Sequence, residues 1–391
     1  MNTAKLTILQ VPLDSLSSDE LKAKIDYFLA GSTPRQIVTV NPEFLLESRS
    51  NEPFRQVLLK ADLSLADGFG LQIAGLVKGC YLARHTGADL SKYLFALAAK
   101  EQHRVAIINW THSLSSSEEI TKVLEKLYPK LVFKIIKAER GEAFLDLSTL
   151  LEFQADIILS TLGAPFQDQL LAELLPQTAI KLGVGIGGSL DYLTGKAERA
   201  PLLFRKLGFE WLWRLAINPQ ARWQRIFAAV CKFPFYFILD DLIHPFLYRP
   251  NVVGFIYRDN EVLIVNSAKE NRDFWKLPQG GVEAGENLAS AIEREMYEEL
   301  KLKNYQITKI YPRLFRYRWP SGYSIRGYKG QSQSLCLLSY KGAKDGITLD
   351  YENRDYKWVP IEELTKQVDP VFEKAYTLFI EKYRRSIKLE S

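Results

Sequence analysis

The sequence predicts two successive domains, an α/β domain with a Rossmann-like parallel sheet and an α+β domain with a mixed sheet between helices. The 391 residues exceed the usual domain size of about 100–200 residues. A composition of 47% hydrophobic and 25% charged residues is typical of globular proteins. The sequence pattern changes near "HPFLYRPN" (residues 244–251). We therefore place the domains at residues 1–245 and 246–391.

The first domain alternates β-rich runs with segments that have apolar residues at helical spacing, which is the pattern of parallel βαβ units. The runs are "QIVTV" (36–40), "RVAIINW" (104–110), "VFKIIKA" (132–138), "ADIILSTLG" (155–163) and "AIKLGVGIGG" (179–188). In the second domain, "NVVGFIYRDNEVLIVNS" (251–267) indicates two alternating strands. One acidic helix, further short strands and a final helix follow.

Several classes of protein are excluded by composition. The longest stretch without a charged residue is 105–117, whereas a membrane-spanning helix needs roughly 20 mostly apolar residues. The N-terminal sequence lacks the features of a secretory signal, so we expect a cytoplasmic protein. The three cysteines and four histidines show no metal-ligand or disulfide spacing, which argues against structural zinc and a disulfide framework.

The acidic helix carries a candidate metal site. Glu295, Glu298 and Glu299 stand at i, i+3 and i+4, so a helix places three carboxylates on one face. Hard oxygen ligands of this kind suit Mg²⁺ or Mn²⁺ together with a substrate phosphate. A solvated acidic helix face is the alternative interpretation of the same residues.

The surrounding sequence resembles the Nudix box, and this resemblance implies a metal-dependent hydrolase. It implies that Glu295, Glu298 and Glu299 bind Mg²⁺ or Mn²⁺. The box also includes supporting positions, which are Gly280, Glu286 and Arg294. Lys301 stands where the family usually has glycine, which affects the loop after the helix.

Three further segments are similar to the RNA 5′-pyrophosphohydrolase and dinucleoside polyphosphate hydrolase group: "WKLPQGG" (275–281), "YKGQSQ" (328–333) and "ENRDYKWV" (352–359). This resemblance implies that Glu298, Glu299 and Glu352 take part in catalysis, with Glu352 assisting the metal or acting as a base. Trp275 and Trp358 either pack in the core or contact substrate. The substrate stays open between a nucleotide sugar, a nucleoside polyphosphate and a signal nucleotide. Basic side chains that could hold its phosphates are Arg313, Arg316, Arg318, Arg326 and Lys329.

Six blocks of the first domain look like the WecG/TagA/CpsF family, glycosyltransferase family 26. They are "VTVNPEFL" (38–45), "ADLSLADGFGL" (61–71), "HTGADL" (85–90), "TLGAPFQD" (161–168), "GVGIGGSLDYLTGKAERAP" (183–201) and "LGFEWLWRLAINPQAR" (207–222). The resemblance implies inverting transfer of an N-acetylhexosamine-type sugar, such as N-acetylmannosamine, from a UDP donor. The acceptor would be a polyprenyl-diphosphate-linked sugar in cell-surface polysaccharide synthesis, and no metal would be required.

An inverting displacement needs a base for the acceptor hydroxyl. Asp67 matches the family's proposed base, whereas without the resemblance its Asp-Gly pair would indicate only a turn. Further positions match the family's substrate site, and these are Thr39, Asn41, Gln167 and Asp191. For Asp191, supporting the loop and touching the ligand are equally compatible with the sequence. Asp168 replaces the glutamate that is usual after the family's glutamine.

Residues 199–232 combine seven basic side chains with one acid, a net charge of +6, and several aromatic residues. Such a segment suits an anionic membrane interface, although nucleic acid could use the same features. The resemblance favours the membrane. It implies that the acceptor diphosphate is bound by Arg214, Arg222 and Arg225. We therefore expect a peripheral enzyme at the inner face of the plasma membrane. Assembly into homo-oligomers is left open.

Two other interpretations fit the same motifs. In one, the chain is chiefly a nucleotide or RNA 5′-end pyrophosphohydrolase whose first domain binds lipid. In the other, the Nudix domain is a non-catalytic nucleotide sensor that regulates the transferase. The departure at Lys301 motivates the second interpretation.

Overall fold

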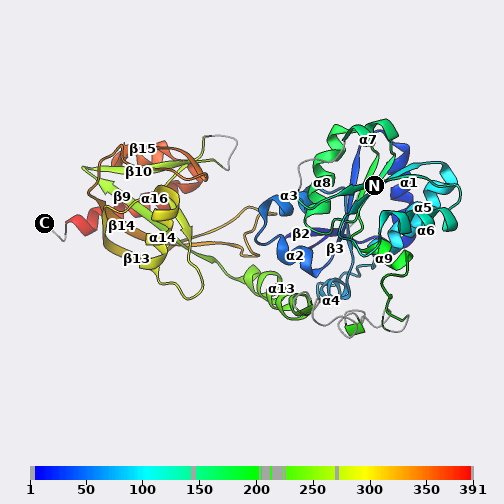
Figure 1. Cartoon of the computed structure of the whole chain (residues 1–391). Helices are drawn as coiled ribbons and strands as arrows, with labels where there is room; N and C mark the ends of the chain where they lie inside the picture. Colours follow the sequence, from blue (N-terminus) through cyan, green and yellow to red (C-terminus); the bar gives the residue numbers. More distant parts are fainter. Residues whose placement is uncertain are drawn as a thin grey trace. The chain divides into compact units, whose positions relative to one another are not determined.

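The computed structural model describes residues 5–141, 147–201, 204, 212–213, 223, 226–268 and 273–388. Three predicted substrate contacts, Arg214, Arg222 and Arg225, lie outside these described residues. The chain divides into two compact units, Met1–Leu242 and Ile243–Ser391. Each unit has its own sheet and core (Figure 1).

A six-stranded parallel sheet forms the centre of the N-terminal unit, which confirms the predicted Rossmann-like domain. In spatial order its strands are β4 (Leu63–Ala66), β3 (Arg35–Val40), β8 (Leu182–Gly185), β7 (Ile157–Ser160), β5 (Arg104–Trp110) and β6 (Val132–Ala138). The sequence patterns predicted five of these strands and missed the four-residue β4. They also missed a short antiparallel hairpin of β1 (Lys5–Ile8) and β2 (Val11–Asp14).

Helices cover both faces of this sheet, because successive strand residues point to opposite sides. Ile37 packs with one helical layer and its neighbour Val38 with the other. Figure 1 shows helices on both sides of the sheet. The layer around Ile37 contains α1 (Ser18–Ala30), α5 (Gly87–Glu101), α6 (Ser117–Leu127) and α9 (Ser189–Leu193). The opposite layer contains α2 (Pro42–Glu47), α3 (Glu52–Lys60), α4 (Phe69–Val77), α7 (Leu147–Phe153), α8 (Phe166–Leu174) and the 3₁₀ turn η1 (Leu175–Gln177).

The N-terminal unit ends in a helix that is partly α-helical and partly π-helical. Its consecutive parts are η2 (Ala228–Lys232), α13 (Phe233–Phe237) and η3 (Ile238–Ile243), and the 3₁₀ turn η4 (His244–Phe246) follows. Phe233 and Phe237 are buried in the core beside α2, α3 and α4. No helix in the described part of the chain has both the length and the apolar character needed to cross a bilayer.

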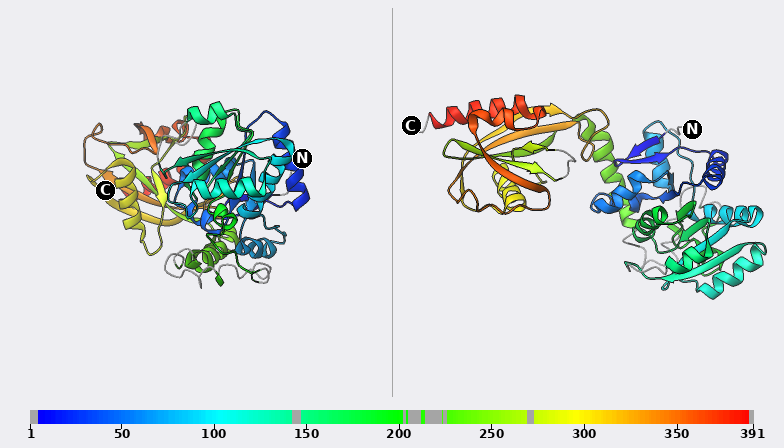
Figure 2. Two further views of the ribbon diagram at one scale, coloured as in Figure 1. Left: turned by 45° about the vertical axis from the view of Figure 1, so that its right-hand side comes forward. Right: turned by 90° about the horizontal axis from the view of Figure 1, so that it is seen from above.

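A mixed seven-stranded sheet forms the C-terminal unit, as the sequence predicted. Its strands are β9 (Arg249–Arg258), β10 (Glu261–Ser267), β11 (Trp275–Lys276), β12 (Gln279–Gly281), β13 (Tyr305–Arg318), β14 (Gly330–Tyr340) and β15 (Asn353–Pro360). Figure 2 shows α14 (Leu288–Leu300) in yellow and α16 (Glu373–Ile387) in red on opposite sides of this sheet. Three short elements precede α16: η5 (Ile361–Glu363), α15 (Leu364–Gln367) and η6 (Pro370–Phe372).

Helix α14 begins and ends with hydrogen-bonded caps. The Asn287 side chain accepts a hydrogen bond from the Ser290 N–H at 2.9 Å. At the other end Lys301 adopts left-handed backbone angles, φ 50° and ψ 25°. The Leu302 N–H then donates to the Met296 carbonyl at 3.2 Å, which closes the helix as glycine usually does. The sequence departure at Lys301 therefore leaves the shape of this helix end intact.

Replacing Lys301 with glycine tests how much strain this cap contains. An L-residue in the left-handed region costs roughly 1–2 kcal/mol, whereas glycine adopts it freely. The Lys301 ammonium also lies 5.0 Å from the Tyr297 ring centre, and the Lys303 ammonium lies 5.2 Å from it. Lys303→Gly is therefore the control for this cation–π contact. We expect Lys301→Gly to be more stable than Lys303→Gly by about 1 kcal/mol in urea unfolding; equal stabilities would contradict the assigned strain.

Candidate active sites

The predicted transferase residues gather at the carboxyl ends of β3, β4 and β8. Open parallel sheets bind their ligands at this edge. The Thr39 hydroxyl donates a hydrogen bond to the Gly185 carbonyl at 3.2 Å, which links the ends of β3 and β8. Asn41 caps α2 by accepting hydrogen bonds from the Glu43 and Phe44 N–H groups. Its side-chain oxygen is therefore engaged in holding the loop after β3.

Asp67 follows directly after β4 and is held at this edge by backbone and side-chain contacts. Its N–H donates to the Val40 carbonyl at 2.7 Å, and one carboxylate oxygen accepts from the Gly87 N–H at 3.3 Å. The Arg84 guanidinium lies 3.9 Å from the other oxygen. The Asp67 side chain is 27% exposed, so a hydroxyl group can reach the carboxylate from solvent.

Arg84 belongs to none of the sequence motifs. The arginine lies in the segment between α4 and α5, outside every quoted block. It approaches Asp67 because the chain returns to the end of β4, where the His85 N–H donates to the Ala66 carbonyl. Only the three-dimensional path of the chain reveals this pairing.

Gln167 shapes the glycine-rich loop after β8. Its side-chain oxygen accepts a hydrogen bond from the Gly187 N–H at 2.9 Å, and Gly187 has a φ of 49°. The Gln167 amide nitrogen occupies the position that a Cβ atom would take at Gly185. Any larger residue at Gly185 would therefore displace Gln167 and, with it, the loop.

Asp168 is fully buried beneath the same loop. Its Oδ1 lies 2.7 Å from the position of a Cβ at Gly185, and neither carboxyl oxygen has a hydrogen-bond partner. Burial raises the pKa of Asp168 to about 7, and the nearby Gln167 amide opposes this shift without reaching hydrogen-bond geometry. The Asp168 side chain therefore packs against Gly185 at the end of β8.

Asp191 connects two loops of the N-terminal unit. One carboxylate oxygen accepts hydrogen bonds from the Ser115 N–H at 3.1 Å and the Ser115 hydroxyl at 2.7 Å. The other oxygen lies 3.1 Å from the position of a Cβ at Gly188. Of the two roles that the sequence left open, these contacts support loop positioning.

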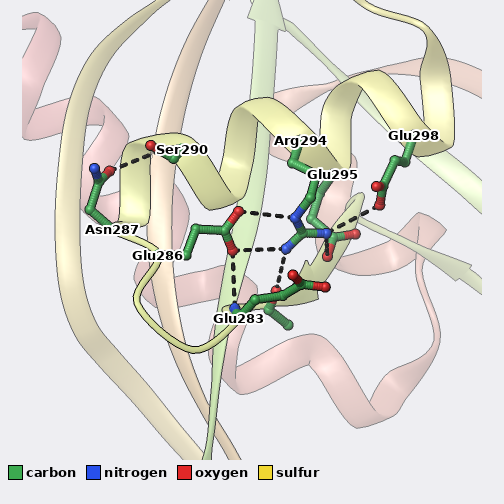
Figure 3. Close-up of polar contacts among 8 residues, drawn as sticks. Glu283, Glu286, Asn287, Ser290, Arg294, Glu295 and Glu298 are labelled. Carbon is green, nitrogen blue, oxygen red and sulfur yellow. Dashed lines mark hydrogen bonds and ion pairs between the residues drawn. The ribbon is translucent and has the colours of Figure 1, made fainter.

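A single arginine organises the acidic helix of the C-terminal unit (Figure 3). Arg294 donates two hydrogen bonds of 3.0 Å to Glu286, and one nitrogen also reaches Glu295 at 2.8 Å and Glu298 at 3.1 Å. A further bond of 2.8 Å goes to the Gly281 carbonyl. These carboxylates, Glu286 first, raise the pKa of Arg294, and Arg294 is the main cause of a lowered pKa at Glu286.

Glu299 is buried and Glu295 is partly buried in this cluster. A Cβ at Gly280 would overlap the Glu295 carboxylate, so glycine leaves the space in which Glu295 lies. Burial raises the pKa of Glu295, although Arg294 opposes the shift. Glu299 is 5% exposed, one of its oxygens has no hydrogen-bond partner, and burial raises its pKa to about 7.

The donor set fits a hard divalent cation. Three carboxylates lie within two turns of α14, and the unpartnered Glu299 oxygen is buried where a cation would neutralise it. Within the described residues, no three Asp, Glu, His or Cys side chains form a ready metal cage. Arg294 instead holds the Glu295 and Glu298 oxygens. Each of these two carboxylates has a second oxygen that could bind a cation while Arg294 keeps its contacts.

Glu352 lies close enough to Glu299 for the two carboxylates to repel each other. Burial is the largest cause of the raised pKa of Glu299, and the Lys276 ammonium opposes it. The nearby carboxylates of Glu295, Glu352 and Asp350 raise this pKa further. Trp275 and Trp358, which the sequence left open between core packing and substrate contact, are partly buried. Trp275 packs on the core beneath α16, and Trp358 packs on the core beneath α14. The Trp358 indole donates to the Lys344 carbonyl at 3.2 Å, and the Lys357 ammonium lies 4.4 Å from the Trp275 ring centre. These contacts favour a packing role for both tryptophans over substrate contact.

The fold and the two clusters define an enzyme with two separate domains, an α/β transferase and a hydrolase of the Nudix type. The family model "Glycosyl transferase WecG/TagA/CpsF family" matches residues 6–245, and the NUDIX domain model matches residues 247–379. The chain belongs to the WecG/TagA/CpsF glycosyl transferase family and carries a NUDIX domain after that region.

Similar proteins are found for both parts of the chain. Two relatives from Staphylococcus aureus, strains MRSA252 and NCTC 8325 / PS 47, are named N-acetylglucosaminyldiphosphoundecaprenol N-acetyl-beta-D-mannosaminyltransferase. Each is 28% identical over 232 residues, covering 58% of this chain and 88% of the relative. A Caenorhabditis elegans Ap4A hydrolase is similar in structure, with 21% identity, 36% of this chain and 98% of that chain covered, and a TM-score of 0.29. An Escherichia coli dihydroneopterin triphosphate pyrophosphohydrolase is 20% identical. The match covers 35% of this chain and 99% of that chain, with a TM-score of 0.28.

The buried Glu299 carboxyl predicts a dependence of stability on pH. Its folded pKa of about 7 lies above its ordinary value of 4.5, so the folded state binds the proton more tightly than the unfolded state. The resulting stabilisation is fully present below about pH 4.5 and is lost as the pH rises through 7. Without divalent metal at pH 8, we expect Glu299→Gln to raise the free energy of unfolding by about 1–3 kcal/mol.

This gain should shrink towards pH 5, where Glu299 itself is neutral. Urea unfolding in EDTA at both pH values measures it. Glu293→Gln, a substitution on the same helix outside the Arg294 contacts, is the control and should show no such pH dependence. A gain of equal size at pH 5 and pH 8 would contradict the assigned charge burial.

Proposed function

We propose that the protein is a bifunctional enzyme at the inner face of the cytoplasmic membrane. Its first domain transfers an N-acetylhexosamine, N-acetylmannosamine by analogy with the relatives, from a UDP donor to a polyprenyl-diphosphate-linked N-acetylglucosamine. Its second domain hydrolyses a nucleoside diphosphate-linked substrate with Mg²⁺ or Mn²⁺. The observation that carries the transferase proposal is the partly exposed Asp67 carboxylate at the carboxyl edge of the parallel sheet.

In the transfer reaction, Asp67 accepts the proton of the attacking acceptor hydroxyl. The new C–O bond forms as the bond to the UDP oxygen breaks on the opposite face of the sugar, which inverts the anomeric centre. The Arg84 guanidinium, 3.9 Å from one Asp67 oxygen, would orient the carboxylate before the reaction. Thr39 and Gln167 hold the ends of β3 and β8, where the donor would bind. Following the family resemblance, we assign no metal cofactor to this domain.

In the hydrolytic domain, Glu295, Glu298 and Glu299 would hold the cation. When bound, a divalent ion screens phosphate charge and lowers the pKa of water. Arg294 positions Glu295 and Glu298 through its nitrogen contacts, and Gly280 leaves room for Glu295. Glu352, in the segment before β15, would assist the metal or accept a proton from water, and its electrostatic effect on Glu299 supports this assignment.

Asp67→Asn tests the transferase proposal. The amide keeps the shape of the carboxylate but cannot accept the proton, so we expect transfer to fall by a factor of about 10²–10⁴. The assay uses UDP-N-acetylmannosamine and a synthetic polyprenyl-diphosphate N-acetylglucosamine, with the product linkage determined. Asp19→Asn, on an exposed helix start, is the control. Full transfer activity in Asp67→Asn would refute the assigned base.

Glu298→Gln and Glu352→Gln test the hydrolase proposal. Each removes one negative charge from the acidic cluster, and we expect kcat for a panel of nucleotide sugars and dinucleoside polyphosphates to fall by about 100-fold with Mg²⁺. Glu293→Gln should retain the wild-type rate. Tight nucleotide binding by the wild type without turnover would instead support a sensor role. Metal-dependent cleavage that persists in both variants would place the chemistry elsewhere.

A further inference from the structure

The first turn of helix α5 contacts both the candidate base and the glycine-rich loop after β8. The first N–H groups of a helix have no partner within the helix. The N–H of Gly87, the first residue of α5, donates to an Asp67 carboxylate oxygen at 3.3 Å. Gly87 also lies close to the loop, since a Cβ at this position would be 3.1 Å from the Ser189 hydroxyl and 3.3 Å from the Ile186 carbonyl oxygen. The position of this turn therefore affects two parts of the candidate transferase site.

Thr86 and Asp89 close this turn with reciprocal hydrogen bonds. Thr86 is the N-cap of α5, and its hydroxyl oxygen accepts from the Asp89 N–H at 3.1 Å. The same hydroxyl donates to the Asp89 carboxylate at 2.7 Å. Caps of this kind stabilise the start of a helix. Because both partners belong to that start, these bonds do not fix its position against the rest of the unit.

Arg199 supplies a contact from a distant part of the chain. It lies in the segment after α9, 110 residues from Asp89 in the sequence. Its guanidinium donates to the two Asp89 carboxylate oxygens at 2.7 and 2.8 Å, and to the Thr86 hydroxyl at 3.3 Å. A two-point contact between a guanidinium and a carboxylate restricts their orientation as well as their distance. Arg199 therefore ties the first turn of α5 to the segment after α9.

The charge on Asp89 keeps this contact in place at neutral pH. The hydrogen bond from Arg199 is the largest influence on Asp89 and lowers its pKa to about 2, although partial burial opposes the shift. The Asp89 side chain is 59% exposed and that of Arg199 is 18% exposed. Such partly exposed pairs contribute little to overall stability. The value of this pair lies in the position at which it holds the helix.

We propose that Arg199 is a positioning residue of the transferase site, which acts through Asp89 and Thr86 to hold the Gly87 N–H against the Asp67 carboxylate. The inference rests on the proposed function, because it takes Asp67 as the base. The held N–H stabilises the ionised carboxylate and fixes its direction. Without the Arg199 guanidinium, the first turn of α5 moves relative to β4, and Asp67 loses this donor. Arg199 itself touches no reacting group.

Arg199→Met tests this role, because it removes the guanidinium and keeps an unbranched side chain. Lys196→Met is the matched control, since Lys196 lies in the same segment but pairs with Glu119 of α6 at 2.7 Å. We expect kcat for transfer to fall by about tenfold in Arg199→Met and to stay at the wild-type value in Lys196→Met. KM for the UDP donor and for the acceptor should stay unchanged in both variants.

A double-mutant cycle tests the route through Asp89. If Arg199 acts through this carboxylate, Asp89→Asn should lower kcat to a similar extent, and the double variant should be no worse than either single variant. Losses that multiply in the double variant would overturn the proposed route. A raised KM for the acceptor with unchanged kcat in Arg199→Met would also overturn it and make Arg199 a substrate contact.

The pH profile separates positioning from a general loss of stability. A carboxylate that loses an N–H donor binds its proton more tightly, so the acidic limb of the kcat/KM profile should move to higher pH in Arg199→Met. Partial unfolding would lower the rate without moving this limb. An unmoved limb in a variant that has lost kcat would therefore contradict the inference.

Hydrogen exchange makes the inference testable without turnover. In the full-length protein, amides of residues 84–90 should exchange at least about threefold faster in Arg199→Met than in the wild type or in Lys196→Met. If the wild type transfers no sugar, the proposed function fails, whereas this measurement still shows whether Arg199 holds the turn. Unchanged exchange in Arg199→Met would overturn the inference.

Discussion

Both active regions depend on a glycine whose missing side chain makes room for a functional group. In the N-terminal unit the Gln167 amide and the Asp168 carboxyl occupy the space beside Gly185, and in the C-terminal unit the Glu295 carboxylate occupies the space beside Gly280. A Cβ atom at either position would overlap these side chains. Close packing of backbone against a polar side chain fixes its direction with little conformational freedom. The positions of the loop after β8 and of the acidic helix face follow from this constraint.

The sequence predicted the features that depend on local periodicity and on motif spacing. The βαβ alternation, the mixed second sheet and the carboxylates of α14 are all readable from neighbouring residues. Features that depend on distant parts of the chain were missed. Strand β4 has only four residues and is identified by its pairing with β3. Arg84 reaches Asp67 because the segment after α4 turns back to the end of β4, a path that no local pattern encodes.

Buried carboxyls in the two units have similar pKa values but different surroundings. Burial raises the pKa to about 7 at both Asp168 and Glu299. Asp168 is enclosed beneath a glycine-rich loop and faces an amide, so its neutral form is compatible with a supporting role. At Glu299 the Lys276 ammonium opposes the shift, whereas the carboxylates of Glu295, Glu352 and Asp350 add to it. Burial is therefore the main cause of the shift in both units, and neighbouring carboxylates add to it only at Glu299.

The chemistry of the two proposed reactions limits how the domains cooperate. Both use a nucleoside diphosphate-linked substrate, and a hydrolase that cleaved the transferase's own UDP-sugar would remove the donor before transfer. If both domains are active on the same chain, the Nudix site must therefore discriminate against the UDP-sugar donor or act on a different nucleotide. Discrimination between close analogues needs polar groups that are satisfied by only one ligand. In the sheet of the C-terminal unit, Gln333 and Asn251 are buried and each has an oxygen without a hydrogen-bond partner, so a ligand group that reached these oxygens and donated to them would be favoured over one that could not.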